Sequence, residues 1–230
     1  AMRASPNFEP FVLSTGQHRE MLDQAMSMVG IDANVDLDLM RPNQLLTGVL
    51  QASIGGIGNT LVRENPDVVL VQGDTTTALS GAQVGYFMGI PVGHVEAGLR
   101  SGNINAPFPE EMNRILISRL AKWHFAPTEL ARDNLLAESV SSEAIHITGN
   151  TVVDSLKELI RHRAREIENK TADRIISKGS RLILVTLHRR ESFGGPIEDI
   201  CRALTEIVNE NQNVELLFPV HLNPKVREVV

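Results

Sequence analysis

Short apolar runs alternate with segments of helical periodicity along the chain, and this alternation constrains the fold more than any other feature. The runs at 68–71 and 181–187 are rich in Val, Ile and Leu, as expected for strands that are buried on both faces. Helical patterns follow them at 75–88 and 196–210. Strands that alternate with helices in this way form parallel sheets covered by helices, so the sequence predicts an α/β protein.

The same pattern divides the chain into two parts. Strands are expected at 11–13, 67–71, 91–95, 122–127, 144–149, 181–187 and 214–220. Helices are expected at 17–29, 44–64, 75–88, 109–121, 127–139, 150–168 and 196–210, the second of them weakened by the sequence IGGIG. The charged stretch 161–180 has no strand signal, which predicts one Rossmann-like domain over 1–168 and the start of another over 169–230.

Composition and charge exclude several classes of protein. The 230 residues carry a net charge of −6 without a basic run, which argues against a general nucleic-acid binder. Cys201 is the single cysteine, so an internal disulfide is impossible and a cysteine-based zinc site is not expected. We therefore expect a cytoplasmic setting. No apolar run approaches the roughly 18 residues of a membrane span.

Chemically active side chains gather after the strands, at the sheet edge where open α/β sheets bind their ligands. The segments that follow the strands are STGQHRE (14–20), QGDTTT (72–77), HVEAGLR (94–100), ITGNT (147–151), LHRRES (187–192) and PVHLNP (219–224). Nearly all of them contain an acid, a histidine or an arginine. Gly, Asn and Ser would suffice for structural turns, so we expect a binding or catalytic site at this edge.

Each acid at this edge also has a structural interpretation. Asp74, at the start of a helix, could serve as its N-cap. Glu96 follows an apolar strand and needs a partner or a ligand, because an unpaired buried carboxylate is unfavourable. Glu110 and Glu111 follow Pro109 and could simply complement the helix dipole in a first turn. Local pattern alone leaves these alternatives open.

The basic residues of the later segments are equally ambiguous. His188 and Arg189 follow a strand and precede a glycine-rich helix start, which favours an anion-contacting turn over a solvated one. His221 could be a core histidine. The GGIG at 55–58 differs from a dinucleotide fingerprint in spacing and follows no strand.

Several ordered motifs together carry a resemblance to a known family. They are QHREMLDQ, GDTTT, GIPVGHVEAGLRSG, PFPEEMNR, FAPTELARDNLL, ITGNTVVDSL, HRRESFG and FPVHLNP, and they span nearly the whole chain. In this order they resemble the non-hydrolysing UDP-N-acetylglucosamine 2-epimerases of bacteria and archaea. The resemblance implies a glycosyltransferase-B-like fold with two Rossmann-like domains, the second of them nucleotide-binding, and a cleft between them.

The sequence departs from the family pattern at both ends. The family's opening GTRPE-type segment and its later SGG and TTERPE segments do not occur here. We therefore expect that the first strand of the first domain is missing, that the second domain is only partly present, and that the chain alone binds nucleotide poorly.

The resemblance also implies a reaction, namely reversible epimerisation at carbon 2 that converts UDP-N-acetylglucosamine into UDP-N-acetylmannosamine. UDP is eliminated and then added back, so the site must remove a proton from one face and deliver one to the other. By motif position, the expected catalytic residues are Asp74, Glu96, Glu110 and His188. The expected substrate-binding residues are Gln17, His18, Arg19, Arg114, Arg189 and His221. Four of these match family positions that bind a second, activating UDP-N-acetylglucosamine, namely Gln17, His18, Arg19 and His221. The resemblance implies a homodimer, and it implies neither a cofactor nor a metal.

Other functions remain open from sequence alone. A hydrolysing relative would release N-acetylmannosamine and UDP with the same carboxylates, and another relative acts on a diacetamido uronic acid. A nucleotide-sugar glycosyltransferase could share the fold but would require an acceptor. An inactive fragment or a binding module is the non-enzymatic alternative.

Overall fold

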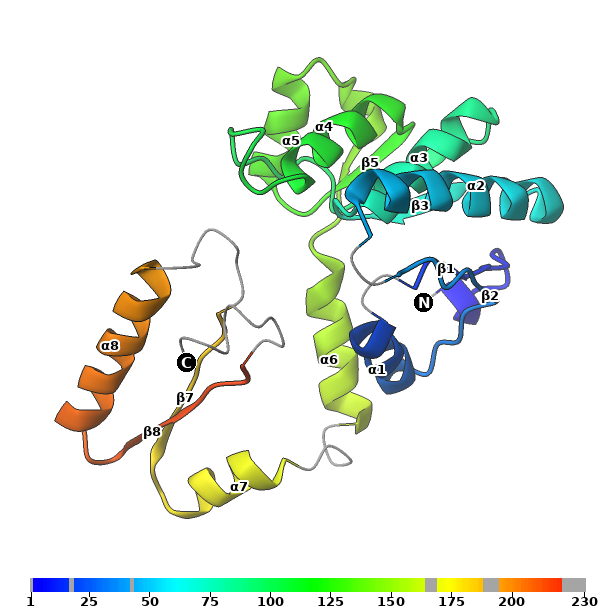
Figure 1. Ribbon diagram of the computed structural model, residues 1–230. Helices are drawn as coiled ribbons and strands as arrows, with labels where there is room; N and C mark the ends of the chain where they lie inside the picture. The colour runs from blue at the N-terminus through cyan, green and yellow to red at the C-terminus, as the bar shows by residue number, and fades with distance from the viewer. Residues whose placement is uncertain (1, 17–18, 42–43, 164–168, 188–194, 221–230) are drawn as a thin grey trace. The chain divides into compact units, whose positions relative to one another are not determined.

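The computed structural model describes residues 2–16, 19–41, 44–163, 169–187 and 195–220 (Figure 1). The chain divides into two compact units, Ala1–Arg163 and Ala164–Val230, which we describe separately. Each unit contains parallel strands joined through helices, so the α/β prediction is confirmed.

A four-stranded parallel sheet forms the centre of the first unit. Its strands lie in sequence order and are β3 (Val69–Gln72), β4 (Val92–Val95), β5 (Trp123–Ala126) and β6 (Ile145–Ile147). In the register of the ladder, His94 of β4 is aligned with Val71 of β3 and with His124 of β5. All four strands run in the same direction, so the segments that follow them meet at one edge of the sheet.

A smaller parallel pair precedes this sheet in the chain. It consists of β1 (Leu13–Ser14) and β2 (Val35–Asp36), and helix α1 (Arg19–Val29) connects the two. The sequence did not predict β2, because a strand of two residues is too short to show a periodic pattern.

The helices of the first unit form close to their predicted ranges. They are α2 (Leu46–Glu64), α3 (Thr76–Phe87), α4 (Glu110–Leu120), α5 (Glu129–Ala137) and α6 (Thr151–Arg163), with short 3₁₀ turns at Met2–Ala4 and Ser142–Ala144. The sequence IGGIG does not interrupt α2. A Cβ atom added to Gly56 would lie 2.7 Å from Leu37 Cδ1, so the glycine permits close packing of α2 on the segment after β2.

Two apolar clusters hold the site's elements in place. The first lies where α3 and α4 pack on β3 and β4, and its buried members are Val71, Ala78, Leu79, Ala82, Val92 and Ile117. The second consists of Ala97, Ala126, Ala131 and Leu135, and it ties α5 to the segment after β4. Helix α3 contacts both α2 and α4, which explains why apolar residues occur on most sides of it.

The second unit contains a parallel pair of strands connected through a helix. Its elements are α7 (Lys170–Ser177), β7 (Arg181–Leu184), α8 (Gly195–Glu210) and β8 (Val214–Leu217), and the two strands pair in parallel. Ile175, Ile197 and Val214 are buried within it. In the parts of both units that the structure describes, no helix is long and apolar enough to cross a membrane.

Candidate active site

Asp74 stands in the turn that joins β3 to α3. Gly73 has a φ of +70°, which turns the chain sharply after the strand. Thr75 is the N-cap of α3, and its side chain accepts a 3.1 Å hydrogen bond from the Ala78 amide. Because the threonine caps the helix, the carboxylate of Asp74 is available for other contacts.

Helix α4 supplies two contacts to Asp74. Arg114 places Nη2 2.5 Å from Oδ2 of Asp74, and the Asn113 side chain donates a 2.8 Å hydrogen bond to the Asp74 carbonyl oxygen. Both the carboxylate and the backbone of Asp74 are therefore held by side chains from one helix.

Glu111 binds the other terminal nitrogen of Arg114. Its Oε2 accepts from Arg114 Nη1 at 2.9 Å, while Oε1 accepts from the backbone amides of Ser101 at 2.8 Å and Gly102 at 3.1 Å. Burial by itself raises the pKa of the Glu111 carboxyl, but the hydrogen bonds from Arg114 and these amides outweigh it and lower that pKa below its usual value. For Arg114, burial is likewise outweighed by Glu111 and Asp74, so the pKa of the guanidinium is raised.

Glu96 follows β4 directly, at the neighbouring position along the sheet edge. Gln72 and Val95 are register partners, so Asp74 and Glu96 extend from the ends of adjacent strands. The φ of Glu96 is +66°, a left-handed conformation that is strained for a residue other than glycine and is frequent at functional sites. Glu110 is half-buried at the start of α4, one helical turn before Arg114.

His94 lies beneath this edge, and sequence reasoning did not select it. The side chain has no exposed surface, and its Nε2 lies 2.8 Å from the Gly73 carbonyl oxygen, to which it donates. Desolvation lowers the pKa of His94 from 6.5 to about 4, against the opposing effect of the Gly73 hydrogen bond and with further lowering by His124 and Arg100. At neutral pH the ring is therefore neutral, and its Nδ1 is buried without a hydrogen-bond partner among the described residues.

Arg100 fixes the loop that follows Glu96. Its Nε and Nη2 bind both carboxylate oxygens of Glu138, at 2.6 and 2.9 Å, and Nη2 also donates to Ser118 Oγ at 3.0 Å. The hydrogen bond from Arg100 lowers the pKa of Glu138. This two-point pair fastens the loop to α4 and to the end of α5, next to the amides that bind Glu111.

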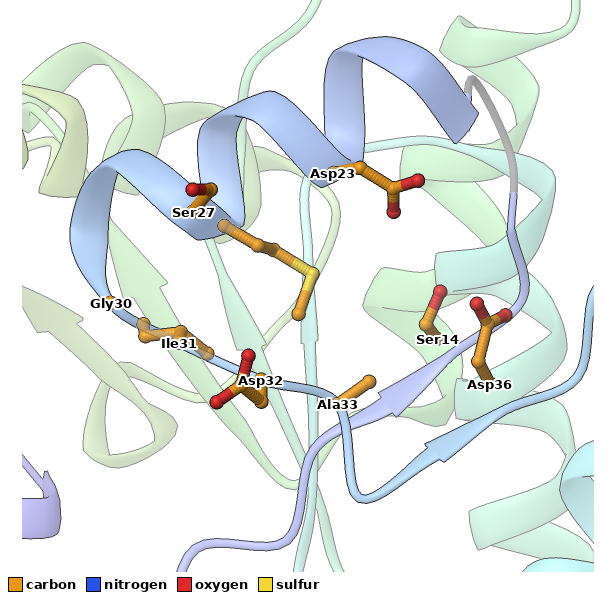
Figure 2. A pocket seen from close by; sticks show the side chains of 9 residues that line it. Ser14, Asp23, Ser27, Gly30, Ile31, Asp32, Ala33 and Asp36 are labelled. Atoms are coloured by element: carbon orange, nitrogen blue, oxygen red, sulfur yellow. The ribbon is translucent and has the colours of Figure 1, made fainter.

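The end of β1 also reaches the start of α3. Thr15 Oγ1 and Thr77 Oγ1 lie 2.8 Å apart, and a hollow of about 270 Å³ is lined by Val12, Leu13, Ser14, Thr15, Leu22, Met26, Thr75 and Thr77. A larger hollow of about 510 Å³ lies between α1 and the β1–β2 pair (Figure 2). Three carboxylates line it, those of Asp23, Asp32 and Asp36, and it does not include Asp74. Within the described ranges, no group of three or more His, Cys, Asp or Glu residues is arranged to hold a metal ion.

Comparisons with known proteins match the whole chain. The family model described as UDP-N-acetylglucosamine 2-epimerase covers residues 1–230. The chain belongs to this family. A UDP-N-acetylglucosamine 2-epimerase of Salmonella typhimurium is 47% identical over 100% of the chain, which spans 62% of that relative's length.

Solved structures agree with the assignment to the epimerase family. The Neisseria meningitidis UDP-GlcNAc 2-epimerase bound to UDP-GlcNAc has a TM-score of 0.92 and 41% identity, with 99% of this chain and 62% of that one covered. The S. aureus MnaA–UDP co-structure has a TM-score of 0.90 and a sequence identity of 40% to this chain. The match covers 99% of this chain and 59% of that one. The predicted glycosyltransferase-B-like fold class is therefore confirmed, with this chain spanning about three fifths of its relatives.

The structure brings together only some of the residues expected from the epimerase motifs. Asp74 and Arg114 are in direct contact, and Glu96 and Glu110 lie on the adjacent strand end and helix start. Other predicted residues fall outside the described ranges, namely Gln17, His18, His188, Arg189 and His221, and Arg19 is described only as the first residue of α1. Sequence reasoning missed Glu111 as a contact of Arg114, and it missed His94 and Asn113.

Proposed function

We propose that this protein catalyses the reversible epimerisation of UDP-N-acetylglucosamine at carbon 2 to UDP-N-acetylmannosamine without hydrolysis. The observation that carries the proposal is the Asp74 carboxylate, which is held by Arg114 at the sheet edge and released from helix capping by Thr75. Relatives of similar sequence bear the name of this activity, and one of them was solved with UDP-GlcNAc bound.

The proposed reaction proceeds by elimination and re-addition. A carboxylate removes the proton on carbon 2 while the bond between carbon 1 and the UDP oxygen breaks, which leaves a glycal and UDP. UDP then returns to carbon 1 while an acid delivers a proton to the other face of carbon 2. Asp74 and either Glu96 or Glu110 share these proton transfers, and His188 faces the departing diphosphate, where positive charge stabilises the leaving group.

The remaining site residues belong to substrate recognition in this proposal. Arg189 assists at the diphosphate, and Arg114 contributes from beside Asp74. Gln17, His18, Arg19 and His221 bind a second UDP-N-acetylglucosamine that activates the enzyme. A homodimer in the cytoplasm is the expected form, and sigmoidal dependence of rate on substrate would support the activating site.

Proton NMR in heavy water tests the reaction. UDP-N-acetylglucosamine is incubated with the 230-residue chain and with a version extended at both ends by the corresponding segments of the Salmonella relative. Deuterium at carbon 2, together with the UDP-linked manno epimer, is the expected result for the extended version. Free N-acetylmannosamine as first product would identify the hydrolysing reaction instead, and absence of exchange in both samples would refute the proposal.

Substitution of Asp74 tests its assigned role. Asp74→Asn is expected to lower the exchange rate at least about 10²-fold, because it removes a group that transfers a proton. Asp133→Asn is a suitable control, since Asp133 is an exposed acid that pairs with Arg132 on α5. A near-normal exchange rate in a folded Asp74→Asn protein would remove Asp74 from the mechanism.

A further inference from the structure

Two adjacent acids at the start of α4 have very different surroundings. Glu110, the predicted catalytic residue, is half-buried, whereas the side chain of Glu111 is only 1% exposed. A carboxylate that is buried to this degree must be fully paired, because an unpaired charge in the interior is strongly unfavourable. Glu111 meets this requirement through three donors, which makes its orientation well defined.

The contacts of Glu111 join two strand ends of the sheet. Its Oε1 receives the amides of Ser101 and Gly102, in the loop after β4, and its Oε2 receives Nη1 of Arg114. The other terminal nitrogen of Arg114, Nη2, contacts Asp74 in the turn after β3. The two oxygens of Glu111 therefore bind different partners: Oε1 binds the loop amides and Oε2 binds the guanidinium.

The planarity of the guanidinium makes this arrangement directional. When Nη1 is held by Glu111, the rotation of the whole planar group is restricted and Nη2 is aimed at Asp74. Without Glu111, the long Arg114 side chain would be free to sample other rotamers. Stability alone is a poor explanation of the contact, because buried ion pairs often add little to folding compared with apolar replacements.

We propose that Glu111 is a positioning residue, which acts through Arg114 to fix the orientation of the Asp74 carboxylate for proton transfer. This inference rests on the proposed function in so far as Asp74 transfers a proton. It assigns to Glu111 no contact with the substrate. Its effect is expected in the rate of the chemical step more than in substrate affinity.

Kinetics of Glu111→Gln in the extended, active version provide the first test. Glutamine keeps the volume and one oxygen for the loop amides, but it turns an amide group toward Arg114 in place of the carboxylate. We expect kcat to fall about 10²-fold, the loss typical of a misplacement of about 1 Å, with KM changed less than about 3-fold. Glu111→Asp keeps the charge but cannot span both partners, so it should fold and show an intermediate loss.

A control variant separates positioning from the loss of an ion pair elsewhere in the unit. Asp133→Asn removes the ion pair with Arg132 within α5, apart from the Ser101 and Gly102 amides and Arg114 that bind Glu111. We expect this variant to keep kcat. Equal loss of kcat in Asp133→Asn and Glu111→Gln would refute the specific role of Glu111.

A double-variant cycle tests whether Glu111 acts through Arg114. The variants Glu111→Gln and Arg114→Lys are measured singly and together, and the double variant should be no slower than the slower single one, because both disrupt one unit. Multiplied losses would contradict the inference.

A crystal structure of Glu111→Gln gives a readout that does not depend on activity. We expect the contact between Arg114 Nη2 and Asp74 to open beyond about 4 Å, the usual limit for an ion pair. An unchanged contact would refute the positioning role even if the protein proved inactive toward UDP-N-acetylglucosamine. Absence of activity in the unsubstituted protein would refute the proposed function but not this geometric result.

Discussion

Replacement of His94 by glutamine should reduce the pH dependence of folding in the first unit. In the folded protein the pKa of His94 is lowered to about 4, chiefly by burial, while the unfolded chain has the ordinary value of 6.5. Between these values the unfolded state binds more protons than the folded state, so the free energy of unfolding falls as the pH falls from 6.5 toward 4. Above this window the ring is neutral in both states and has no such effect.

The size of the effect follows from the difference in pKa. One unit corresponds to about 1.4 kcal/mol, so His94 alone accounts for a loss of about 2 kcal/mol between pH 7 and pH 5. The pKa of His124 is also lowered by burial, which adds a loss of the same sign. Glu111 and Glu138 have pKa values below 4.5, so their ionisation contributes mainly at lower pH and interferes little above pH 5.

Urea denaturation followed by tryptophan fluorescence measures this loss in the relevant unit. Trp123 is the single tryptophan of the chain and lies at the start of β5, so its signal reports on the first unit. Glutamine at position 94 can still donate to the Gly73 carbonyl oxygen from its amide nitrogen but does not titrate. We expect His94→Gln to reduce the loss between pH 7 and pH 5 by about 2 kcal/mol.

A second buried histidine provides a check on the assignment. The pKa of His124 is also lowered, chiefly by burial, so His124→Gln should reduce the loss of stability on acidification in the same sense. If His94→Gln lost as much stability on acidification as the unsubstituted protein, the assignment of the effect to His94 would be wrong.

Two further substitutions test the local structure around the site. Gly98→Ala should destabilise the first unit by about 3 kcal/mol or more, because φ is +85° and the added Cβ would lie 2.2 Å from the Ala131 carbonyl oxygen, an overpacking clash. Gly89→Ala has a similar φ of +72° with open space around it, so urea denaturation should show a loss of only about 1 kcal/mol, and equal losses in the two variants would contradict the clash. Thr75→Ala removes the cap that accepts the Ala78 amide and should reduce the unfolding free energy by about 1 kcal/mol, whereas no change would mean that Asp74 takes over capping.

The fold class could be predicted from sequence because its signal is repeated many times. Each apolar strand such as 68–71 is followed by a helix of clear periodicity, and errors at single boundaries do not change the conclusion. β2 escaped prediction since two residues carry no period. The continuity of α2 through IGGIG depends on the approach of Leu37 to Gly56, a tertiary contact that local helix propensity does not reflect.

The candidate site could be predicted only in part, for a similar reason. Asp74 stood out because a carboxylate directly after an apolar strand requires an explanation. The local pattern does not show which of Glu110 and Glu111 is buried, and only the packing of the 101–102 amides against α4 does so. His94 lies inside an apolar strand, so local pattern gives it the appearance of an ordinary core residue, and its contact with Gly73 depends on the pairing of β3 and β4.

One turn of helix α4 positions three side chains of the site together, because Glu111, Asn113 and Arg114 all contact their partners from it. Further along the same helix, Ile117 is fully buried in the cluster with Val71. A change of volume at Ile117 would displace the entire helix and thereby all three contacts together. We therefore expect substitutions at Ile117 to lower activity more than they lower stability. Some of these variants should fold normally but have a low kcat.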